Sequence, residues 1–179
     1  MTIHIPKNPT QQGFFILEAL VAILIFAFGI LGLVALSSQA ISSQSDAEYR
    51  TVAANLANEI ASTITLGVNR CAACVVSSDV ATQITNSLAA YAHHPTGATC
   101  AFTGAASANA DVLAWVTKII PAAGAPLLPG AADTGLQVSI PVNNDPNTGV
   151  SRNEVDITVC WKGPKDIAQR HYTLVTYVN

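Results

Sequence analysis

The feature that most constrains this chain is an unbroken apolar run near its amino terminus. Every residue in 14–36 is apolar except Glu18. As a helix that rises about 1.5 Å per residue, this run would be roughly 34 Å long, which is enough to cross a hydrocarbon core about 30 Å thick. The next charged residue after Glu18 is Asp46. The sequence therefore predicts a transmembrane helix over 14–36.

The residues on either side of this run indicate its orientation. The segment before it is short and polar and carries Lys7, whereas the segment after it is neutral as far as Asp46. This small bias favours an amino terminus on the cytoplasmic side. A secretory signal peptide has only about 7 to 15 apolar residues before its cleavage site, so the run is too long for one. A protease could instead cut at the polar-to-apolar junction, where Gly13 leaves the backbone unhindered.

Glu18 is the one ionisable residue in the predicted membrane helix. A carboxylate at the centre of a bilayer costs about 2.5–3.5 kcal/mol on insertion scales, and less near an interface. Glu18 could reach the headgroups, where the dipole of the first helical turns favours an acid, or it could pair with a cation. Cleavage after Gly13 would create an α-amine on Phe14, which a neighbouring subunit could present to Glu18.

The order of these residues resembles a known export signal. It is similar to the class III signal of type IV pilins and type II secretion pseudopilins. The shared order is a polar leader, Gly13, Phe14, three apolar residues, Glu18 and a long apolar run. In that family a prepilin peptidase cuts after the Gly and methylates the new terminal Phe, and the Glu pairs with a neighbour's amine during assembly. The resemblance implies these roles for Gly13, Phe14 and Glu18. It also implies four successive segments: a cleaved leader over 1–13, a transmembrane and polymerisation helix over 14–36, the periplasmic half of the same helix over 37–66, and a globular head over 67–179.

Composition argues against several other functions. The net charge is −3, only 11% of residues are charged, and there is no basic cluster, so we expect no nucleic-acid binding. The chain shows no Ser/His/Asp arrangement, no distinctive carboxylate pair and no Gly-rich phosphate loop. We therefore expect no enzyme, no cofactor and no metal site. A membrane-tethered thiol oxidoreductase is the main catalytic alternative, and it would use Cys71 and Cys74.

The four cysteines all follow the predicted membrane helix, at Cys71, Cys74, Cys100 and Cys160. An even number in a small exported domain favours two structural disulfides, for which three pairings are possible. Cys71 and Cys74 also fit a redox C-x-x-C, although that motif usually stands near a strand-to-helix junction. They also fit half of a zinc site, but Cys100 and Cys160 are too far apart in sequence to complete it at ordinary spacing.

Apolar periodicity predicts three helical segments outside the membrane. The long helix continues over 37–66, with an apolar stripe that ends near Leu66. Shorter amphipathic patterns cover 79–91, with Asp79 as a possible cap, and 109–120, with Asn109 as the cap and Trp115 pointing inward.

The connections between these helices and the following strands are predicted to be loops. His93 and His94 precede a proline, and on a regular backbone two adjacent side chains point in different directions, so they read as solvated loop residues and a weak metal pair. The segments 96–110 and 121–135 are rich in small residues. Leu127 and Leu128 are either anchors of the second loop or a contact patch.

The last 45 residues change to a period of two. Alternating apolar residues predict strands near 136–140, 155–160 and 172–177, with turns at 143–149 and 162–165. A three-stranded antiparallel meander of this kind needs a helix on its apolar face. The expected fold class is α+β and, by resemblance, type IV pilin-like: a long amino-terminal helix packed on a small antiparallel sheet, with one or two short helices between them.

The carboxy-terminal segment resembles one group of that family. It is similar to the end of minor pilins called type IV pilus modification protein, PilV, in three places: 156–161 (DITVCW), the Gly163-Pro164 turn and 171–178 (HYTLVTYV). The segment 111–115 (DVLAW) also resembles that group's D-L-x-x-W helix. The resemblance implies a minor pilin of the bacterial inner membrane that enters a pilus. Its expected partners are major and minor pilins, prepilin peptidase, the assembly platform and a tip adhesin. The alternatives are a type II secretion pseudopilin and a periplasmic domain on an uncleaved anchor.

Overall fold

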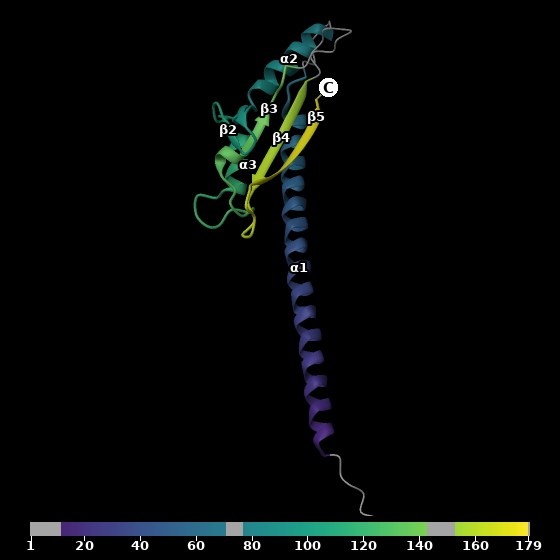
Figure 1. Cartoon of the computed structure of the whole chain (residues 1–179). Helices are drawn as coiled ribbons and strands as arrows, with labels where there is room; N and C mark the ends of the chain where they lie inside the picture. Colours follow the sequence, from purple (N-terminus) through teal and green to yellow (C-terminus); the bar gives the residue numbers. More distant parts are fainter. Residues whose placement is uncertain (1–11, 71–76, 143–152, 179) are drawn as a thin grey trace, which may run out of the picture. The chain divides into compact units, whose positions relative to one another are not determined.

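The computed structural model describes residues 12–70, 77–142 and 153–178. The fold is α+β, with a long amino-terminal apolar helix and two small antiparallel sheets (Figure 1). The chain divides into two compact units, one up to Ser45 and one from Asp46 onward. The leader before residue 12, Cys71, Cys74 and the predicted turn at 143–149 lie outside the described residues.

The first unit is the amino-terminal part of helix α1, which spans Gln12–Gly67. Every side chain from 15 to 44 is exposed, including large apolar ones such as Phe26 at 68%. The hydroxyl of Ser37 donates to the Leu33 carbonyl at 2.9 Å, so this polar side chain is satisfied within the helix. By length and composition, α1 is the one described helix that could cross a membrane.

The remainder of α1 belongs to the second unit and supplies one wall of its core. Ala53, Leu56, Ile60 and Ile64 recur at a spacing of three or four residues and are at most 4% exposed. They form one buried cluster with side chains of the sheet, so the predicted stripe is confirmed in this part of the helix, whereas Ile41, which the pattern also placed on it, is 65% exposed. The helix ends at Gly67, one residue beyond the predicted end, where a side chain would collide with the hydroxyl of Tyr91.

The main sheet has three antiparallel strands in the order β3-β4-β5, as the alternating pattern predicted (Figure 1). Their bounds are Leu136–Ser139, Glu154–Trp161 and Arg170–Tyr177. Val138 pairs with Ile157, and Ile157 pairs with Leu174, so the apolar side chains of one face line up across the strands. Val138 and Ile157 are fully buried. The central strand β4 therefore lies between its neighbours with its apolar face in the core.

Two short helices precede the sheet. Helix α2 spans Ser77–Ala89 and begins two residues before the predicted start, so Asp79 lies in its first turn and the prediction that it caps the helix was wrong. Helix α3 spans Ala110–Ile119, and the Asn109 side chain accepts from the Asp111 amide at 2.9 Å, which confirms the predicted cap. Trp115 is buried, and its indole N–H donates to the Leu56 carbonyl of α1 at 2.9 Å.

The segment predicted as an irregular loop over 96–110 contains a β-hairpin. Strand β1 spans Thr96–Ala98 and pairs antiparallel with β2, which spans Ala101–Thr103. The prediction failed because the strands are short and consist mostly of small residues, which carry little apolar alternation. In the second loop, Leu128 is fully buried and Leu127 is half exposed, so Leu128 is the anchor.

Candidate functional site

The residues of the proposed processing signal lie at the start of α1. Gly13 and Phe14 are in its first turn, and the Phe14 side chain is outside the described part of the structure. Glu18 is exposed on the helix, and the next basic residue along the sequence is Arg50. Within the described part of α1, no cation is therefore close enough in sequence to neutralise Glu18.

Two of the four cysteines form a disulfide in the head. Cys100 stands between β1 and β2, and Cys160 lies near the end of β4. They are joined across a separation of 60 residues, with 5.6 Å between their Cα atoms. Together with Phe102 they make a small buried cluster, separate from the main core. The disulfide fastens the β1-β2 hairpin to β4, and of the predicted cysteine sites this is the one that the described residues include.

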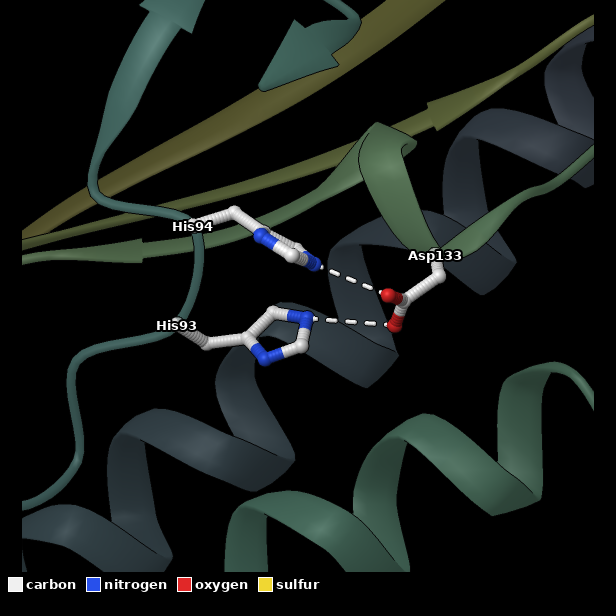
Figure 2. Close-up of side chains that lie close together, drawn as sticks. All are labelled: His93, His94 and Asp133. Carbon is white, nitrogen blue, oxygen red and sulfur yellow. Dashed lines mark hydrogen bonds and ion pairs between the residues drawn. The ribbon is translucent and has the colours of Figure 1, made fainter. Parts of the chain in front are cut away.

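A second cluster of chemically active side chains was missed by the sequence prediction. His93 and His94 follow α2 and are 1% and 9% exposed, so the prediction that they are solvated loop residues was wrong. Both rings point toward Asp133 (Figure 2), which lies in the short 3-10 helix η1, Asp133–Gly135, just before β3. The distances to the carboxylate oxygens are 3.4 Å from His93 Nε2 and 2.8 Å from His94 Nε2.

The backbone explains how two adjacent histidines reach one carboxylate. His94 has a φ of 42°, in the left-handed region that is unusual for a residue with a Cβ. This breaks the alternation of a regular strand and brings the two ring centroids to 4.3 Å from each other. The bend is held by backbone hydrogen bonds from His93 N to Val138 O and from His94 N to Ala105 O, at 2.9 and 3.0 Å.

The hydrogen bonds around the two rings assign their protons. The Ser107 amide donates to His93 Nδ1 at 3.2 Å, so this nitrogen is unprotonated and Nε2 carries the hydrogen. His94 Nδ1 lies 3.0 Å from the Gly104 carbonyl and donates to it. Because His94 Nε2 is also 2.8 Å from an oxygen of Asp133, the two form a charge-assisted pair when His94 is doubly protonated.

The electrostatics follow from these contacts. Burial, together with the nearby charge of His94, lowers the pKa of His93 and so favours its neutral form. The hydrogen bond to Asp133 raises the pKa of His94, and burial opposes that effect. The lowered pKa favours the neutral form of His93, and the raised pKa favours the charged form of His94 beside the half-exposed carboxylate of Asp133.

The same three residues have the donor set of a transition-metal site. Their ligand atoms all lie within 4.8 Å of one another. The Gly104 carbonyl orients His94 as an outer-shell acceptor does in metal sites. A metal bound at His93 Nε2 would move the ring hydrogen to Nδ1, which could then no longer accept from the Ser107 amide. Losing that hydrogen bond would cost about 0.5–1.5 kcal/mol. That is small beside the roughly 10–16 kcal/mol of structural zinc sites, so His93 would be the weakest of three possible ligands.

Sequence reasoning had little from which to find this cluster. His94 and Asp133 are 39 residues apart, and neither stands in a recognisable ligand motif. The adjacent histidines were the one visible signal, and they were dismissed on the assumption of a regular backbone. Comparisons with protein-family models, with curated proteins and with solved structures give no match.

Proposed function

We propose that this chain is a minor pilin, a structural subunit that is cleaved, methylated and then incorporated into a type IV pilus. The observation that carries the proposal is the contrast within α1. Over 15–36 its residues are apolar apart from the single carboxylate of Glu18, and every side chain there is exposed in the isolated chain. A surface of this kind requires an apolar environment outside its own chain.

Lipid and a filament of neighbouring helices both provide that environment. In the membrane the apolar part of α1 spans the bilayer with its amino terminus in the cytoplasm. On assembly it exchanges lipid for the apolar side chains of other subunits, so little free energy of burial is lost. Glu18 then meets the α-amine of Phe14 on a neighbouring subunit, and the ion pair offsets the cost of burying its charge.

The head fits an exported location. The disulfide between Cys100 and Cys160 is of the kind that forms and persists in an oxidising compartment such as the periplasm. The head would face the periplasm while the subunit waits in the inner membrane, and would lie on the pilus surface or at its tip after assembly. Major and minor pilins, prepilin peptidase, the inner-membrane assembly platform and a tip adhesin are the expected partners.

The first test is the intact mass and amino-terminal peptide of the protein from inner membranes and from sheared pili. We expect a chain that begins at N-methylated Phe14 in both fractions. A chain that still begins at Met1 would mean a permanent anchor and would overturn the proposal. Cleaved protein that stays in the cell envelope and is absent from purified pili would favour a type II secretion pseudopilus.

The second test separates the role of Glu18 from general effects on the helix. Glu18→Ala should be cleaved normally yet be lost from sheared pili. Glu48→Ala is the matched control, because Glu48 is also an exposed glutamate on α1 but lies beyond the apolar part. Equal incorporation of the two variants would count against the pairing of Glu18 with a neighbouring amine.

A further inference from the structure

The cluster of His93, His94 and Asp133 has a geometry that goes beyond a structural subunit. We propose that these three residues bind one divalent transition-metal ion of the zinc, copper or nickel class. The proposal rests on the positions of the ligand atoms, on a buried nitrogen that lacks a hydrogen-bond partner, and on a backbone that holds both rings toward the same point (Figure 2).

The spacing of the ligand atoms suits one small ion. Bonds of about 2.0–2.2 Å from a tetrahedral zinc place neighbouring ligand atoms roughly 3.3 Å apart. The Nε2 atoms of His93 and His94 lie 3.4 and 2.8 Å from the two oxygens of Asp133. All three ligand atoms lie within 4.8 Å of one another, so each is near the spacing that one shared ion requires.

The Nε2 atom of His93 is the second, independent observation. It is buried and faces Asp133, but its 3.4 Å distance to the Asp133 Oδ1 atom is too long for a well-made hydrogen bond, so the nitrogen is left unsatisfied among the described residues. A buried polar atom without a partner is uncommon in native proteins and calls for an explanation, of which an ion is one. Here this nitrogen points toward the Asp133 carboxylate, as does Nε2 of His94 (Figure 2).

The surroundings of the cluster favour metal binding over a chance contact. His94 Nδ1 donates to the Gly104 carbonyl, which fixes the ring and leaves Nε2 toward Asp133. The left-handed backbone of His94 is a strained conformation of the sort found at ligand-holding positions. The Asp133 side chain is 53% exposed, so an ion can enter from solvent and water can complete its coordination.

The ligand types define the class of ion. Two imidazoles and one carboxylate suit zinc, copper or nickel, whereas calcium and magnesium prefer all-oxygen ligands. A bound ion would connect the segment after α2 to η1, immediately before β3. In this way it would fasten two parts of the head that the Cys100–Cys160 disulfide does not join directly.

The experiment uses the full chain without a histidine tag, purified in detergent and stripped with a chelator. Equilibrium dialysis against Zn²⁺, with metal analysis of the protein, should give one ion per chain, and Ca²⁺ and Mg²⁺ should not compete. Co²⁺ loaded in place of Zn²⁺ should give the visible absorption of a four-coordinate site with nitrogen and oxygen ligands. A wild-type chain that is folded and binds less than a stoichiometric amount of Zn²⁺ and Co²⁺ would overturn the proposal.

Variants then assign the ligands. His94→Gln and Asp133→Asn should each weaken Zn²⁺ binding by more than about 100-fold, and His93→Gln by about 10- to 100-fold, because His93 exchanges the Ser107 hydrogen bond for its metal bond. His171→Gln is the matched control: His171 is exposed on β5, and its loss should leave affinity unchanged. Equal losses in all four variants, or none in His94→Gln and Asp133→Asn, would contradict the assignment. If a variant fails to fold, the Co²⁺ spectrum of the wild-type chain still decides whether the site exists.

Discussion

The two parts of α1 have opposite relations to the rest of their own chain. Over 15–44 every side chain is exposed, and up to Leu36 all of them are apolar except Glu18. Over 46–67 the helix is amphipathic, and its apolar residues, such as Leu56 and Ile60, lie in the core of the head. One continuous helix thus contains a segment stabilised by its own fold and a segment that depends on its surroundings. The sequence shows the same difference, because apolar residues recur with a helical period in the second segment but not in the first.

Removing the disulfide should have the largest effect, because it should destabilise the head without affecting the apolar part of α1. In a chain-entropy model, a cross-link across 60 residues stabilises the folded state by about 4 kcal/mol. We therefore expect the double variant Cys100→Ser, Cys160→Ser to lose about that much free energy of unfolding in the head. Urea titration followed by pulse proteolysis measures it. The variant should remain in the membrane fraction, and its release from membranes would show that the apolar part of α1 depends on the head after all.

Truncating isoleucines in the two parts of α1 tests the comparison directly. Ile60 is 1% exposed and Ile25 is 65% exposed. Ile60→Ala should destabilise the head by about 2–5 kcal/mol, because it leaves a cavity, whereas Ile25→Ala should change head stability by less than about 0.5 kcal/mol. Calorimetry of the two variants in the same detergent is the measurement. Similar losses in both would mean that the first part of α1 also packs in a core.

A smaller effect should appear at Asp156 and should depend on pH. Burial raises the pKa of this carboxyl, with the charge of Glu154 as a second cause. The folded state therefore holds the Asp156 proton more tightly than the unfolded state. Its unfavourable contribution is absent below the ordinary aspartate pKa of about 3.9, grows as pH rises from there to the raised folded pKa, and is constant above it. Asp156→Asn should be more stable than wild type at pH 7 and about equal at pH 3. If the difference in stability between the two proteins is the same at pH 3 and pH 7, the titration of Asp156 is not its cause.

The smallest effect should come from the contact between α3 and α1. Lys118 Nζ lies 2.7 Å from both carboxylate oxygens of Glu59, but both side chains are about half exposed. Solvent screens such a pair, so Lys118→Ala should cost about 0.2–1 kcal/mol and less at high salt. A double-mutant cycle with Glu59→Ala isolates the pair. A coupling energy above about 1 kcal/mol would show that screening is weaker than the exposure of the two side chains indicates.

Local patterns predicted much of the fold. The stripe on α1, the Asn109 cap and the alternation in the last 45 residues each depend on neighbours within a few positions. The structure agrees with the cap and the alternation, and with the stripe except at Ile41, which is exposed. The β1-β2 hairpin lacked such a pattern because its residues are small. Asp79 is a possible cap by its residue type and its place near the expected start, but α2 begins earlier, at Ser77.

The candidate sites divide in the same way. Gly13, Phe14 and Glu18 form a contiguous signal that can be read from the sequence, and their roles remain a prediction. The pairing of Cys100 with Cys160 and the meeting of His94 with Asp133 are set by tertiary structure, across 60 and 39 residues. The positive φ of His94 has no sequence signal at all. Pairings of this kind become visible only when the chain is folded.

The positions of the two tryptophans have a practical consequence for spectroscopy. Trp115 and Trp161 are both buried in the head, and the chain has no other tryptophan. The indole N–H of Trp115 has a carbonyl acceptor, whereas that of Trp161 finds none among the described residues. Intrinsic fluorescence should therefore report on the head from two distinct indole environments. The apolar part of α1 is dark at these wavelengths, so its passage from lipid to filament would need an added dye to be seen.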